Sequence, residues 1–121
     1  KMVIAQIRTT NIEESIDFYI NKLGFKLGFS YRDFYAGIET GNGTFHLKLV
    51  DNKEPSIDFV KQGGHFHLYF PTKDALEKVK DLKSKGVKFL TEAHDTDYSK
   101  NEFSIVDNQG HTLFFGEINE D

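Results

Sequence analysis

The fold is decided by residues 4–26, which read IAQIRTTNIEESIDFYINKLGFK. The first five of these residues alternate as in a β-strand, and apolar side chains then recur at helical spacing over Ile12–Leu23. Asn11 precedes this segment and Glu14 follows three residues later, a pattern typical of a capped helix N-terminus. Gly24 favours the left-handed backbone that ends many helices. These residues predict one strand followed by one helix.

The same order of elements recurs in the second half of the chain. His65–Phe70 predicts a strand, Lys73–Lys85 predicts a helix with Thr72 as its cap, and Gly86 is expected to end that helix. An internal repeat of this kind indicates two copies of one supersecondary unit. Three further strands are expected in each copy. The first of these strands is expected directly after Gly24. The other five are expected at Tyr31–Glu39, Thr44–Val50, Val87–Thr91, Asn101–Val106 and Thr112–Gly116.

The repeat predicts an α+β fold made of two βαβββ modules. We expect a single domain over residues 1–121, with module one at about 1–55 and module two at about 60–121. The segment Asp51–Gly64 is polar and contains Pro55, and it is interpreted as the link between the modules. Because a lone module leaves sheet edges exposed, the two modules are expected to pair.

The composition excludes several classes of function. The 121 residues carry a net charge of −4 and no run of Lys or Arg, so nucleic acid is not an expected partner. No apolar stretch approaches the roughly 20 residues of a membrane-spanning helix. The absence of Cys excludes disulfides and thiolate metal sites, and a cytoplasmic location is expected. The 12 Phe and 5 Tyr residues suggest that some aromatic side chains line a ligand site.

One face of each predicted sheet should carry polar and aromatic side chains. If the helix of a module covers the apolar face, the alternate residues of each strand lie on the opposite, inner face. In Thr44–Val50 the apolar residues are Phe45, Leu47 and Leu49, which leaves the residues between them on the inner face. The same argument in the other strands completes the set of candidate ligand-binding residues, which are Arg8, His46, Lys48, His65, His67, Tyr69 and Phe114.

Four stretches carry a resemblance to a known family. They are Asn11–Ser15 with Phe18-Tyr19 and Leu23–Phe25, then Gly64–Leu68, Lys85–Val87 and Asp107–Phe115. In this order and spacing they resemble the vicinal oxygen chelate superfamily, which includes glyoxalases, extradiol dioxygenases and bleomycin-resistance proteins. Asn108 and Gln109 depart from the family's turn before the last strand. The resemblance implies paired half-barrels of βαβββ modules around a cavity, and a homodimer.

The resemblance also implies where a metal ion would bind. Metal-dependent members take ligands from the first and last strands of each module, and these places hold Ile4, His65, His46 and Phe114. Ile4 and Phe114 cannot bind a metal, and two imidazoles fall short of the ligands of a zinc or iron centre. Arg8 and Lys48 would also repel a divalent cation. No cofactor is therefore expected, and a divalent metal on His46 and His65 is the alternative.

The leading hypothesis is metal-independent binding of a small aromatic or anionic ligand, as in antibiotic-resistance proteins that sequester a drug. Tyr69 and Phe114 would hold an aromatic group between them. Arg8 and Lys48 would favour an anionic group on the ligand. The rival hypothesis is an enzyme of the same superfamily, either a metal-dependent lyase or dioxygenase, or a metal-free enzyme with one of the histidines of residues 65–67 as general base. A third hypothesis is a partner-binding module whose cavity is vestigial.

Other titratable residues are interpreted as structural or solvated. His94, Asp95 and Asp97 form a cluster that would suit a hard metal ion, but their place in a polar segment favours a solvated loop. His111 is expected at the surface of a turn. Residues 117–121 are expected to form a frayed tail.

Overall fold

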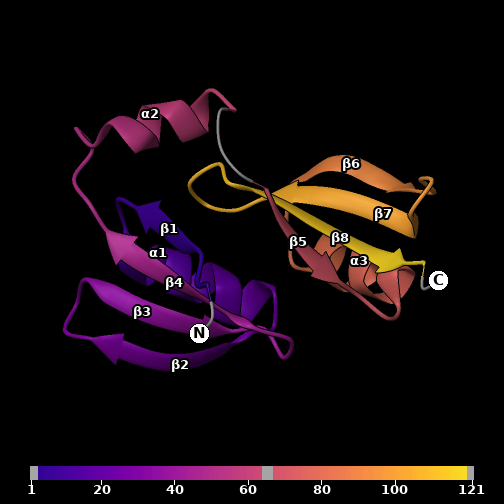
Figure 1. Ribbon diagram of the computed structural model, residues 1–121, viewed down its shortest axis with the longest axis horizontal. Helices are drawn as coiled ribbons and strands as arrows, with labels where there is room; N and C mark the ends of the chain where they lie inside the picture. Colours follow the sequence, from indigo (N-terminus) through magenta and orange to yellow (C-terminus); the bar gives the residue numbers. More distant parts are fainter. Residues whose placement is uncertain (1–2, 64–66, 120–121) are drawn as a thin grey trace. The chain divides into compact units, whose positions relative to one another are not determined.

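The computed structural model describes residues 3–63 and 67–119. The chain forms two compact units, Lys1–Gln62 and Gly63–Asp121, and each unit carries one four-stranded sheet with a helix packed against it (Figure 1). The element order confirms the α+β class and the repeated βαβββ module predicted from the sequence.

Unit one contains the first copy of the repeat. Strand β1 (Gln6–Thr9) leads into a helix that begins as α1 (Ile12–Asp17) and continues as the π-helix η1 (Phe18–Lys22). The remaining strands are β2 (Lys26–Tyr31), β3 (Tyr35–Glu39) and β4 (Thr44–Leu49). The sheet order is β1-β4-β3-β2, in which β1 is parallel to β4 and the other pairs are antiparallel. A short helix, α2 (Pro55–Lys61), follows the sheet.

Unit two repeats this topology. Strand β5 (Leu68–Pro71) is followed by helix α3 (Ala75–Ser84), and then by β6 (Phe89–His94), β7 (Ser99–Val106) and β8 (Thr112–Ile118). The sheet order is β5-β8-β7-β6, and β5 is parallel to β8 as β1 is parallel to β4.

Each sheet buries one face against its own helix. In unit one Tyr19 is fully buried, and its ring packs edge-on against Phe45 of β4 at a centroid distance of 5.0 Å. In unit two Leu82 of α3 is fully buried, and the buried rings of Phe103 and Phe115 stack at 5.1 Å. Burying a side chain of this size contributes roughly 1.5–3 kcal/mol. Along β4 and β8 the buried residues alternate with more exposed ones, as the sequence predicts.

Side-chain caps fix where the helices begin. Asn11 Oδ1 accepts the Glu14 N–H at 3.1 Å, which confirms the predicted cap. The cap of the second helix is not Thr72, as predicted, but Asp74, whose Oδ1 accepts the Glu77 N–H at 3.3 Å. The Thr72 hydroxyl donates instead to a carbonyl of β5, so it ends the strand rather than starting the helix.

Two local predictions are wrong, and the predicted polar link between the modules contains a helix that was not predicted. This helix, α2, buries Ile57 and Val60; a helix of about two turns is too short for its apolar period to stand out. The predicted strand from Tyr31 is interrupted, because residues 32–34 form the turn between β2 and β3. His111, which was predicted at the surface, is only 8% exposed. The Asp107 carboxylate accepts the backbone N–H of His111 at 2.9 Å, which draws the turn inward.

The predicted frayed tail is also shorter than expected. Strand β8 continues through Ile118, and Glu117 is part of it. The Glu117 carboxylate accepts the Ala75 N–H at 2.9 Å, at the first residue of α3. A carboxylate at the positive end of a helix stabilises it, so the end of β8 is tied to the start of α3.

Candidate functional site

The face of each sheet opposite its α1 or α3 helix is called the open face here. On the open face of unit one, Gln6 lies opposite His46 and Arg8 lies opposite Lys48. Lys48 also lies opposite Tyr35 of β3. These side chains share the face because the alternate, apolar residues of β4 are buried on the other side. The structure therefore brings together the first three candidates predicted from the sequence.

Four of these side chains form one hydrogen-bonded chain, called the relay here. Arg8 Nε donates to Gln6 Oε1 at 3.3 Å, and Gln6 Nε2 donates to the Tyr35 hydroxyl at 3.3 Å. The Tyr35 hydroxyl lies 2.8 Å from His46 Nδ1. Because an arginine can only donate, the oxygen of the Gln6 amide must face Arg8 and its nitrogen must face Tyr35.

The relay favours one of the two neutral forms of His46. The Tyr35 oxygen already accepts a hydrogen bond from Gln6, so its own proton is available for His46 Nδ1. A neutral imidazole that accepts at Nδ1 carries its proton on Nε2 and is a donor there. A metal ion would need the Nε2 lone pair, and therefore the opposite placement of the proton.

Aromatic rings flank His46. The Phe29 ring stands edge-on to the imidazole at 5.3 Å and lies nearly parallel to the Tyr35 ring at 6.3 Å. Phe29 occupies this position because Gly37 has no side chain: a Cβ there would stand 2.2 Å from Phe29 Cε1. Sequence reasoning missed Phe29, since every residue of β2 is exposed and its alternation carries no signal. It missed Tyr35 because the predicted strand ran through the turn that precedes β3.

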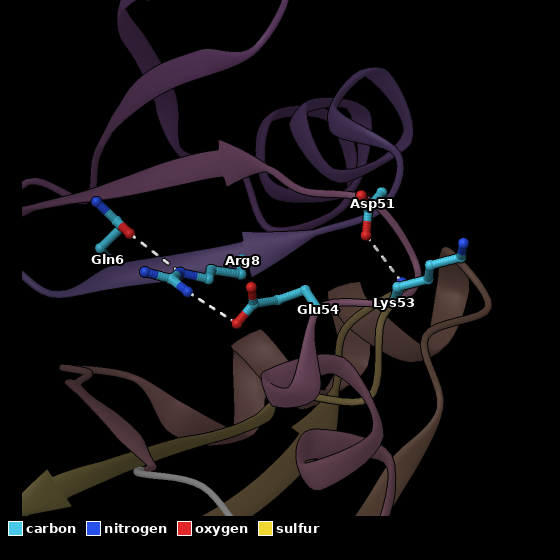
Figure 2. Close-up of polar contacts among 5 residues, drawn as sticks. All are labelled: Gln6, Arg8, Asp51, Lys53 and Glu54. Atoms are coloured by element: carbon cyan, nitrogen blue, oxygen red, sulfur yellow. Dashed lines mark hydrogen bonds and ion pairs between the residues drawn. The ribbon is translucent and has the colours of Figure 1, made fainter.

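The two cations of this face differ in their partners. Arg8 Nη1 forms an ion pair with Glu54 Oε1 at 3.0 Å, in addition to the Nε bond to Gln6 (Figure 2). Glu54 is the residue before α2 and makes no side-chain cap to the helix; it follows a turn in which Asp51 accepts the backbone N–H of Lys53 (Figure 2). Lys48, by contrast, has no ion-pair partner in the part of the chain that the structure describes. Lys48 is therefore the cation more available to a ligand.

Aromatic side chains also line the open face of unit two. Tyr69 lies opposite Phe114, and their parallel rings are 6.4 Å apart, while His67 stacks on Phe114 at 5.2 Å. A flat ligand between Tyr69 and Phe114 would need about 7 Å, which is two contacts of about 3.5 Å. The two rings thus form a continuous surface rather than the two walls predicted from the sequence. His65 lies outside the described residues.

The candidate metal ligands among the described residues make other contacts. Within residues 3–63 and 67–119 no three His, Cys, Asp or Glu side chains are grouped so as to hold a metal ion. His46 Nδ1 belongs to the relay. In the predicted loop cluster, His94 ends β6 with Nδ1 2.8 Å from the Glu92 carbonyl, and Asp95 Oδ1 accepts the Asn101 N–H at 3.1 Å.

Two mixed sheets, each with a polar and aromatic open face, define the class of protein. The chain belongs to the Glyoxalase/Bleomycin resistance protein/Dioxygenase superfamily, whose family model matches residues 1–115. No curated protein matches the chain in sequence. None of the described helices is long and apolar enough to cross a membrane.

Solved structures share this fold along nearly the whole chain. TioX from Micromonospora sp. ML1 is 15% identical, with a TM-score of 0.76 over 100% of this chain and 98% of its own. TnmS3, an antibiotic binding protein from Streptomyces sp. CB03234, is 17% identical, with a TM-score of 0.75 over 98% of both chains. The bleomycin-binding protein of Streptomyces verticillus, solved with copper(II)-bleomycin, is 14% identical, with a TM-score of 0.70 over 99% of this chain and 98% of its own.

Proposed function

We propose that the chain binds, without a metal ion, a small aromatic ligand that carries an anionic group, on the open face of unit one. The observation that carries this proposal is the relay. When the Tyr35 hydroxyl donates to Nδ1, a neutral His46 presents Nε2 as a hydrogen-bond donor beside the rings of Phe29 and Tyr35. Lys48, which has no ion-pair partner among the described residues, lies on the same face. The carboxylate of such a ligand accepts hydrogen bonds from both the histidine and the lysine, and the aromatic part of the ligand packs on the two rings.

The donor set supports metal independence. When the Tyr35 hydroxyl donates to Nδ1, the other nitrogen of a neutral His46 carries a proton, and the cations Arg8 and Lys48 lie on the same face. The superfamily includes both binding proteins and enzymes, and two proteins of the same fold are named for binding an antibiotic or bleomycin. These likenesses support ligand binding as the function to test first.

An NMR titration tests the proposal. Naphthoate is added to ¹⁵N-labelled protein, with the uncharged naphthamide as the comparison ligand. We expect naphthoate to shift the backbone amides of His46 and Lys48, and Lys48→Met to weaken its binding roughly fivefold. Lys80→Met, which removes an exposed lysine of α3 and changes the net charge equally, should leave binding unchanged. Equal binding of naphthoate and naphthamide would contradict the anionic part of the proposal.

Metal dependence is tested on the same protein. Protein purified without chelator is assayed for bound metal and then titrated with naphthoate in the presence of EDTA. We expect the affinity to be unchanged by EDTA. A loss of binding that Zn²⁺ or Ni²⁺ restores would favour the rival, metal-dependent lyase or dioxygenase. The homodimer and the cytoplasmic location remain predictions, and light scattering on the purified chain checks the first.

A further inference from the structure

Strand β7 contains a β-bulge on the open face of unit two. In the β7–β8 pair Lys100 lies opposite Glu117 and Phe103 lies opposite Phe115, so two residues of β7 face the single residue Gly116. The extra residue is Asn101, which has a φ of 54° in the left-handed region that Asn tolerates. Bulges often redirect a side chain next to a functional site.

A buried carboxylate lies on the open face next to the bulge, and the bulge adds a hydroxyl beside it. Phe103 is buried toward the helix, so Glu102 lies on the opposite side, and the extra residue puts Ser99 on that side as well. The Ser99 hydroxyl donates to Glu102 Oε1 at 3.2 Å. Glu102 is 4% exposed and has no ion-pair partner among the described residues. A buried carboxylate is costly unless a cation or several donors compensate its charge.

A tyrosine hydroxyl lies beside this carboxylate. The Tyr69 hydroxyl extends over Gly116, where a Cβ would stand only 2.3 Å from it. The hydroxyl is shielded from solvent, and no described donor or acceptor completes a well-formed hydrogen bond to it, although Ser99 and Glu102 are its neighbours. A buried polar atom of this kind in a folded protein indicates a missing partner.

Aromatic rings surround the carboxylate as well. The Tyr98 ring lies 6.4 Å from the Tyr69 ring, and Phe114 continues the row on the other side of Tyr69. Tyr98 is 55% exposed, and its hydroxyl interacts with Glu102. His94 is the cross-strand partner of Glu102 on β6, but its Nδ1 is bonded to a backbone carbonyl. Aromatic faces next to a carboxylate are the usual environment of a bound ammonium group.

We propose that the open face of unit two binds the protonated amine of a small aromatic ligand, with the Glu102 carboxylate as the ion-pair partner, the Tyr69 hydroxyl as a further acceptor, and the aromatic row as the surface on which the ring of the ligand packs. This site is separate from the anion site proposed for unit one and does not depend on it. Two local features form this site. The bulge places Ser99 on the same face as Glu102, and Gly116, which has no side chain, leaves room for the Tyr69 hydroxyl beside them.

The test uses benzylammonium as the probe and benzyl alcohol as its uncharged analogue. Both are titrated at neutral pH and low salt into the ¹⁵N-labelled full chain. We expect benzylammonium to shift the amides of Ser99, Glu102 and Gly116, and benzyl alcohol to shift them at least fivefold less at equal concentration. Similar shifts from both compounds would overturn the proposal, and this comparison requires no variant.

Two variants and one control locate the charge. Glu102→Gln keeps the size and one acceptor of the side chain, and we expect it to weaken benzylammonium binding about tenfold while leaving benzyl alcohol unchanged. Tyr69→Phe removes only the hydroxyl and should weaken benzylammonium binding about threefold. Glu77→Gln removes an exposed carboxylate of α3 and should have no effect. Unchanged benzylammonium affinity in both the Glu102 and the Tyr69 variants would show that the site is elsewhere.

The two proposed sites can be tested independently of each other. Naphthoate is read at the amides of unit one and benzylammonium at those of unit two, in the same protein. If one of the two ligands causes no shifts in the wild-type chain, the site proposed for that ligand is refuted and the other proposal is unaffected.

Discussion

The Tyr35 hydroxyl lies 2.8 Å from Nδ1 of His46, and through this contact a tyrosine of β3 favours the form of the histidine that is protonated on Nε2. The constraint begins at Arg8, which cannot accept a hydrogen bond, and passes through the Gln6 amide to the tyrosine. A side chain of the adjacent strand β1 thus favours one of the two neutral forms of His46.

The relay predicts the tautomer of His46. At a pH of about 8, where an ordinary histidine is neutral, the ring should carry its proton on Nε2. Tyr35→Phe removes the donor to Nδ1, so the variant should show a mixture of the two tautomers. Ring ¹⁵N chemical shifts from long-range ¹H–¹⁵N spectra measure this directly, without a ligand. A wild-type ring protonated at Nδ1 would contradict the relay.

At the proposed anion site, Glu54 would compete with the ligand for Arg8. Because Glu54 Oε1 lies 3.0 Å from Arg8 Nη1, Glu54→Gln should leave the guanidinium more available and strengthen naphthoate binding up to about fivefold. The ion pair is partly solvent-exposed, so the loss in unfolding free energy should stay below about 1 kcal/mol. Calorimetric titration and urea unfolding measure the two effects. Glu13→Gln, an exposed carboxylate of α1, is the matched control, and equal effects of both variants would show only a change of net charge.

A buried hydroxyl pair holds α1 to β1. Thr9 is fully buried, and its Oγ1 accepts both the Ser15 hydroxyl at 2.8 Å and the Asn11 N–H at 3.1 Å. Thr9→Val keeps the shape but removes this acceptor, and we expect a loss of about 1–3 kcal/mol in unfolding free energy by urea denaturation. Thr9→Ser should restore most of it. Thr44→Val, at an exposed position that begins β4, should change stability by less than about 0.5 kcal/mol.

Alkaline unfolding should report on Tyr69. Burial raises the pKa of its hydroxyl above 10.0; the Ser99 hydroxyl acts in the opposite direction, and the Glu102 carboxylate raises the pKa further. Folding therefore favours the protonated phenol. This contribution to stability is fully present below the ordinary pKa and is lost as the pH rises through the higher pKa of the folded protein.

Tyr69→Phe should accordingly lose less unfolding free energy than the wild type between about pH 9 and pH 11. Denaturant unfolding at several pH values gives the two slopes. Tyr31→Phe, at the exposed end of edge strand β2, is the matched control and should keep the wild-type slope. If Tyr69→Phe follows the wild-type curve as well, the hydroxyl is not held in a buried environment.

The sequence predicted the parts of this molecule that depend on regular periods. The internal repeat and the alternation along β4 were enough for the βαβββ order and for the faces of Arg8, His46 and Lys48. The features that the sequence did not predict depend on local departures from the strand or helix period. Gly37 allows Phe29 to fold over its own sheet, and the two turns of α2 are too few to show a helical stripe.

The bulge is the clearest example of such a departure. Strict alternation counted back from the buried Phe103 puts Glu102 on the open face but Ser99 on the helix side. The extra residue Asn101 restores Ser99 to the open face, so two residues three apart point the same way. The face on which Ser99 lies thus depends on the backbone conformation of Asn101, which the periodic pattern of the sequence does not predict.

Gly37 has a consequence for how this protein can change over time. A methyl group at this position would move the Phe29 ring away from His46, while the buried side of the sheet would stay as it is. Any glycine codon becomes an alanine codon by a single nucleotide substitution. A different arrangement of the aromatic rings around His46 is therefore within one point mutation of the present sequence.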